Sequence, residues 1–78
     1  MLKYELIENN DDFVSYRYYP EGGTDSGYIT IRKKDKKTID QKIVDIDEFK
    51  WYYFKMLHRI KEFIDNNKFE KSGIIAWY

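Results

Sequence analysis

The sequence predicts an α+β domain, in which an antiparallel meander of about four strands packs on one long helix and a short C-terminal strand follows. Apolar and polar residues alternate over most of residues 1–44, which is the period of half-buried strands. Apolar residues recur at three- and four-residue spacing over residues 46–66, which is the period of a helix that covers a core. Because the strand-like segments precede the helix and do not alternate with helices, an antiparallel sheet is favoured over a parallel α/β fold. A chain of 78 residues is expected to form one small globular domain over residues 1–78.

The four expected strands are residues 2–8, 13–19, 28–34 and 38–44. Alternation is clear in the second strand, where Val14 and Tyr16 share one face and Ser15 and Arg17 share the other. Pro20 lacks an amide hydrogen and should close that strand. Turn-forming residues separate the strands at 9–12, 21–27 and 35–37, and three of the four glycines lie in the middle segment.

The helix is expected over residues 46–66, about 20 residues or ~30 Å long. Asp45 and Glu48 have the spacing of a capping box, in which each side chain bonds a free amide at the start of the helix. Val44 and Phe49 occupy the flanking apolar positions that fix the entry of the chain. The expected core stripe of the helix consists of Phe49, Tyr53, Met56, Leu57, Ile60, Phe63 and Ile64.

The C-terminal residues 72–78 are apolar and prone to form a strand. An apolar terminus left in water would be unusual. We therefore expect this tail to add a strand to its own sheet or to the sheet of a partner.

Composition excludes several classes of protein. The chain has 14 basic and 14 acidic residues and 19% aromatics, unlike a disordered segment, which has low hydrophobicity and high net charge. No stretch reaches the roughly 18 apolar residues of a membrane-spanning helix, and residues 1–10 do not resemble a signal peptide, so a cytoplasmic location is expected. The chain has no cysteine, which excludes disulfides and thiolate sites. Lysine predominates over arginine and alanine occurs once, a bias typical of low-GC bacteria, their phages or mobile elements.

One group of side chains on the helix has two explanations. At 100° per residue, Trp51, Phe54 and His58 lie opposite the core stripe. The two large aromatics could cover a loop or the C-terminal tail. Alternatively, they form an exposed patch that binds a protein partner or a second copy, because aromatics with a charged rim are typical of interface centres.

A basic run at an expected hairpin tip supports an alternative function. The run contains Arg32, Lys33, Lys34, Lys36 and Lys37. Basic residues pair with phosphates and nearby tyrosines can stack on bases, which suggests a nucleic-acid-associated accessory protein. Against this, the net charge is zero and lysines at a turn also keep a sheet edge from aggregating. The aromatic residues on the flanking strands are Tyr16, Tyr18, Tyr19 and Tyr28.

The sequence contains no recognisable catalytic motif. His58 and Glu62 have helical i,i+4 spacing, but two ligands fall short of the four of a closed metal site. No serine lies in a strand–turn–helix elbow, and the glycine-rich loop lacks the lysine of a phosphate-binding loop. We therefore expect no enzyme, no cofactor and no metal. The leading hypothesis is a non-enzymatic protein-interaction module, with self-association through the helix patch or a free sheet edge as one form of it.

Overall fold

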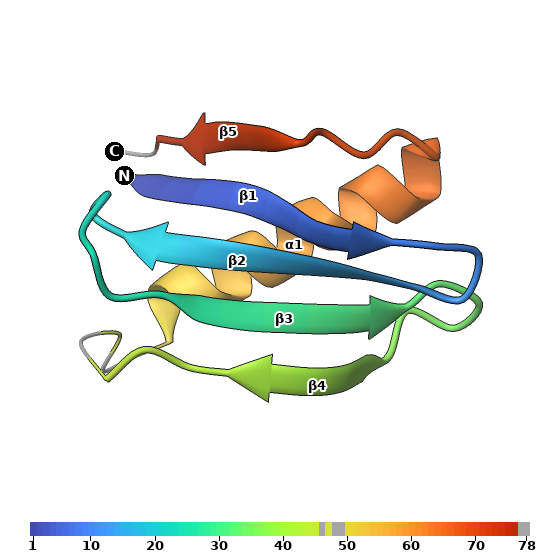
Figure 1. The fold of residues 1–78 in the computed structure, drawn as a ribbon, viewed down its shortest axis with the longest axis horizontal. Helices are drawn as coiled ribbons and strands as arrows, with labels where there is room; N and C mark the ends of the chain where they lie inside the picture. The colour runs from blue at the N-terminus through green and yellow to red at the C-terminus, as the bar shows by residue number, and fades with distance from the viewer. Residues whose placement is uncertain (46, 48–49, 77–78) are drawn as a thin grey trace.

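The computed structural model contains a five-stranded antiparallel sheet with one helix across one of its faces (Figure 1). The elements are β1 (Leu2–Asn9), β2 (Phe13–Pro20), β3 (Gly27–Arg32), β4 (Thr38–Lys42), α1 (Trp51–Asn66) and β5 (Ser72–Ile75). The structure describes residues 1–45, 47 and 50–76. The expected α+β class is confirmed. The sheet has five strands in the order β4-β3-β2-β1-β5, because the C-terminal tail pairs within the chain.

The core lies between α1 and one face of the three central strands. Alternation along β2 buries Val14, Tyr16 and Tyr18 completely, as their pattern predicts. They meet the helix residues Met56 and Ile60, which are also fully buried. This arrangement follows from an apolar strand face and an apolar helix stripe, each of which excludes water only against the other.

An aromatic cluster closes the end of the core beneath the last turns of α1. The ring centroids of Tyr4, Tyr16 and Phe63 lie 5.5 to 6.0 Å apart. The Tyr4 hydroxyl donates to the Glu70 carboxylate at 2.6 Å, and the Tyr16 hydroxyl donates to the Glu70 carbonyl oxygen at 2.5 Å. Burial, with Glu70 as a second cause, raises the pKa of Tyr4 to about 12. These hydroxyls stay protonated and tie the segment after the helix to the sheet.

The helix begins at Trp51, five residues later than the sequence predicts. Lys50 has φ 60, a left-handed conformation that cannot continue a right-handed helix from earlier residues. Before it, the Asp47 amide donates to the Val44 carbonyl and the Lys50 amide donates to the Asp47 carbonyl, both at 2.9 Å. The expected start at Ile46 is therefore wrong. The C-terminal boundary is confirmed, because Asn67 adopts the left-handed conformation that ends a helix.

Asp47 caps the helix instead of Asp45. Its carboxylate accepts the amide of Tyr52 at 3.1 Å and the amide of Tyr53 at 2.8 Å, and the residue is buried. These amides belong to the first turn of the helix, whose amides have no hydrogen-bond acceptors within the helix. Asp45 is exposed. Glu48 and Phe49, which complete the expected capping box and apolar pair, lie outside the described residues.

The sheet face away from α1 carries mainly polar residues. On this face Ser15 and Thr30 are both buried, and their hydroxyl oxygens lie 2.8 Å apart. Tyr19 donates to the Glu5 carboxylate at 2.5 Å on the same face. In the described part of the chain, no helix has both the length and the apolar character needed to cross a membrane.

Candidate functional site: the outer face of the helix

Trp51, Phe54 and His58 lie on the side of α1 that faces away from the sheet. Trp51 is 66% exposed and Phe54 is 54% exposed, while the His58 side chain is 79% exposed. Buried residues of the same helix, such as Tyr53 and Met56, occupy the opposite side. The sequence placed these three residues correctly because helical periodicity determines which side chains share a face.

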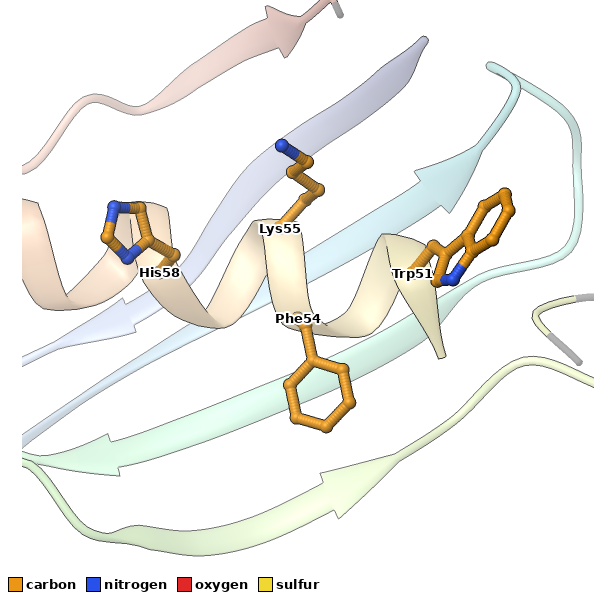
Figure 2. A pocket seen from close by; sticks show the side chains of 4 residues that line it. All are labelled: Trp51, Phe54, Lys55 and His58. Atoms are coloured by element: carbon orange, nitrogen blue, oxygen red, sulfur yellow. The ribbon is translucent and has the colours of Figure 1, made fainter. Parts of the chain in front are cut away.

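These residues and Lys55 surround a shallow hollow of about 420 Å³, and we refer to the four side chains as the helix patch (Figure 2). Lys55 was missed at the sequence level, although its i+4 spacing from Trp51 could have indicated it. Figure 2 shows the two aromatic rings pointing away from one another, with Lys55 projecting from the opposite side of the helix to Phe54. The patch therefore presents apolar rings and a cation along two turns of one helix.

The first turn of α1 is held firmly, which fixes the position of the patch. The Phe54 ring packs edge-on against the Tyr53 ring with centroids 5.2 Å apart. Tyr53 is buried, and its hydroxyl donates to the Gln41 side chain. On the other flank, the Tyr52 hydroxyl donates to Glu21 in the loop after β2. Because these contacts fix the backbone that carries the patch, less conformational entropy is lost when the patch binds.

The described part of the C-terminal tail lies on the sheet edge and does not cover the exposed rings. β5 pairs antiparallel with β1, with Leu2 opposite Ile75 and Lys3 opposite Ile74. This pairing holds residues 72–75 at the edge of the sheet and leaves Trp51 and Phe54 exposed. Trp77 and Tyr78 lie outside the described residues.

His58 lies beside Glu62, as the spacing of the two residues predicts. Its Nε2 lies 3.3 Å from a carboxylate oxygen of Glu62, one turn further along the helix. Over the described residues, no three histidine, aspartate or glutamate side chains gather into a group suited to a metal ion. The Glu62 carboxylate therefore borders the helix patch at its His58 end.

The basic run lies at the β3–β4 turn, and several of its cations are engaged within the protein. Arg32 donates to both carboxylate oxygens of Asp35, at 3.1 and 2.8 Å, and this guanidinium lowers the pKa of Asp35 to about 2. Lys36 pairs with Asp65 at the end of α1. Lys33 donates to the Asn9 side chain at 2.6 Å and lies 4.5 Å from the centroid of the Phe69 ring. Much of the run thus has a structural explanation.

Two cations of the run and two of the flanking tyrosines remain at the surface. Lys34 and Lys37 are exposed. Tyr19 and Tyr28 are half-buried, whereas Tyr16 and Tyr18 are fully buried in the core and cannot stack on a base. Binding of nucleic acid through this turn stays a prediction.

Comparison with known proteins assigns no family. No family model, curated protein or solved structure matches the chain. A functional assignment therefore depends on the surface chemistry of the chain itself.

Proposed function

We propose that this chain is a non-enzymatic module that binds another protein through the helix patch. The observation that carries the proposal is the exposure of Trp51 and Phe54, 66% and 54%, on the outer side of a helix whose inner side is buried. Trp is the residue most enriched where binding energy concentrates, and interface centres are rich in aromatics. Residues that stabilise this fold lie on the inner side, so the fold itself does not account for two large rings on the outer side.

The charges around the rings favour a partner with an acidic rim. Lys50 and Lys55 flank Trp51 along the first turn of the helix, and Lys50 is exposed. The acidic residues of the outer side lie further along, where Glu62 pairs with His58 and Asp65 pairs with Lys36. The half of the patch that holds the rings is therefore positive. A complementary surface would offer an apolar pocket for Trp51 and carboxylates around it.

The experiment compares four forms of the protein as baits: the unchanged chain, Trp51→Ala, Phe54→Ala and Ile74→Ala. Ile74 is a matched control, because it is 60% exposed and lies in β5 rather than on α1. A partner is first captured from extract of the source cell with the unchanged chain, then purified and titrated into each bait by calorimetry. We expect Trp51→Ala and Phe54→Ala each to weaken binding by about tenfold or more, and Ile74→Ala to leave it unchanged.

Thermal unfolding separates binding from folding. The exposed position of Trp51 predicts that Trp51→Ala changes the free energy of unfolding by less than about 0.5 kcal/mol. Phe54→Ala also loses the ring contact with Tyr53 and is expected to cost about 0.5–1.5 kcal/mol. A strong fall in melting temperature with unchanged binding would show that Trp51 belongs to the core, and the proposal would fail. Equal affinity for all four baits would also reject it.

A further inference from the structure

The free edge of β4 is a second surface, separate from the helix patch. β4 is the last strand on one side of the sheet, and all five of its residues are exposed (Figure 1). Among the described residues, no strand pairs with its outer side. Such an edge offers unpaired amides and carbonyls to another strand.

One hydrogen bond shows which backbone groups of β4 face away from β3. The Gln41 amide donates to the Asp40 carboxylate at 2.9 Å, which places that amide on the outer side of β4 and not toward β3. Outward and inward backbone groups alternate along an antiparallel strand. Gln41 and Ile43 therefore direct amide and carbonyl away from β3, whereas Asp40 and Lys42 direct theirs to Thr30 and Tyr28 of β3. On pairing, the Gln41 amide would exchange the Asp40 carboxylate for a carbonyl of the new strand.

We infer that two copies of this chain pair antiparallel through β4, with Gln41 opposite Gln41 of the second copy. In this register Asp40 lies opposite Lys42 of the second copy, and Lys42 lies opposite its Asp40. All four side chains are on the sheet face away from α1, where opposite charges facing across two strands attract. The charge pattern of β4 is therefore complementary to itself.

Neighbouring registers are disfavoured by the same charges. Centring the two-fold axis on Asp40 places two carboxylates opposite each other, and centring it on Lys42 places two ammonium groups opposite each other. A shift by a single residue would face outward backbone groups with inward ones, so no ladder could form. Charges on an edge strand usually prevent unspecific pairing, and here they also select one partner and one alignment.

The remaining contacts of this alignment are apolar. Ile39 is 48% exposed and would lie opposite Ile43 of the second copy. The Gln41 side chain accepts from Tyr53, so the first turns of α1 lie beside the two-fold axis and both helices cover the same face of one continuous sheet. β5, the other edge, contains Ser72, Gly73, Ile74 and Ile75, with no charge to fix a register.

The test is a charge swap, followed by sedimentation equilibrium over a wide range of concentrations. The unchanged chain is expected to shift from its monomer mass of 9.6 kDa to twice that mass as concentration rises. Asp40→Lys and Lys42→Asp each place like charges opposite each other at both positions, and each is expected to weaken the dimer by about tenfold or more. The double variant Asp40→Lys with Lys42→Asp restores attraction and is expected to dimerise again.

Mixing the two single variants gives the sharpest test of the register. The Asp40→Lys chain then presents two lysines and the Lys42→Asp chain two aspartates, so an equimolar mixture is expected to form a heterodimer that neither variant forms alone. Both side chains are exposed, so circular dichroism melts should match those of the unchanged chain. A monomer at every concentration would overturn the inference, as would single variants that dimerise like the unchanged chain.

This dimer does not depend on the proposed function of the helix patch. Trp51→Ala should weaken partner binding and leave the dimer intact, while Asp40→Lys should weaken the dimer and leave partner binding intact. A dimer that Trp51→Ala dissociates would instead place the self-interface on α1 and reject the role of β4. Amide exchange gives an independent readout, since the outward-facing Ile43 amide should gain protection as the dimer forms.

Discussion

Replacing Asp47 with alanine should unfold the start of α1 more than any other change in the segment that precedes it. The buried carboxylate accepts two first-turn amides, from Tyr52 at 3.1 Å and Tyr53 at 2.8 Å. Without it, both amides would be left without their carboxylate partner close to the core. Loss of this cap would also release the first turn, which holds Tyr53 against Gln41.

The size of the effect follows from the two hydrogen bonds. Loss of a helix cap costs about 0.5–2 kcal/mol, and a hydrogen bond to a charged group contributes about 1.5–3 kcal/mol. Because one buried carboxylate serves two amides, we expect Asp47→Ala to lower the free energy of unfolding by about 2–3 kcal/mol. For a domain of this size that corresponds to a fall in melting temperature of about 10–20 °C.

Urea unfolding of Asp47→Ala, Asp47→Asn and Asp45→Ala would test this reasoning. Asp47→Asn keeps one acceptor oxygen and should lose about half as much stability as Asp47→Ala. Asp45→Ala is the matched control, because Asp45 is exposed and should change stability by less than about 0.5 kcal/mol. If Asp45→Ala cost more than Asp47→Ala, the capping role of Asp47 would be refuted and the capping box of the sequence would be restored.

Three further predictions concern the core and the pH dependence of stability. Met56→Ala removes a fully buried side chain and should cost about 2–5 kcal/mol in urea unfolding; a cost below about 1 kcal/mol would contradict its place in the core. Ser15→Ala leaves the Thr30 hydroxyl buried without its partner and should cost about 1–3 kcal/mol, and adding Thr30→Val should cost less than the sum of the two single changes in a double-mutant cycle. Burial is the main cause that raises the pKa of Tyr4 and of Tyr18 from 10.0 to about 12, so the stability that these neutral groups contribute is complete below pH 10 and lost between pH 10 and 12. In an absorbance titration, Tyr4→Phe and Tyr18→Phe should each remove an ionisation step above pH 10, and loss of a step near pH 10 in either variant would contradict the assignment.

Periodicity predicted most of the fold, because burial acts directly on the spacing of apolar residues. Val14, Tyr16 and Tyr18 alternate with polar neighbours and are all buried. Alternation also places Ile39 and Ile43 on one face of their strand, yet Ile39 is 48% exposed, because the register between β3 and β4 shifts beside it. A bulge depends on pairing between strands, which one strand's sequence does not encode.

The start of the helix was mispredicted because two aspartates compete for the cap. Asp45 and Asp47 both precede the apolar stripe, and the glutamate at 48 favoured Asp45. In the structure Asp47 is the capping residue, because Lys50 has a left-handed conformation and the helix begins only at Trp51. Lysine has no particular preference for that conformation, so no residue type indicated it.

The two proposed surfaces differ in whether the sequence alone could predict them. Helical spacing was enough to place Trp51 and Phe54 outside, because an i,i+3 pair shares a face wherever the helix packs. The free edge at β4 needed the strand order, which depends on the long-range pairing of β5 with β1. Once the tail occupies the β1 edge, β4 is the outer strand that carries charges of both signs, and Asp40 and Lys42 become a recognition pattern. If the charge-swapped chains form the heterodimer, the docking of the tail at one edge of the sheet will explain why self-association takes place at the other.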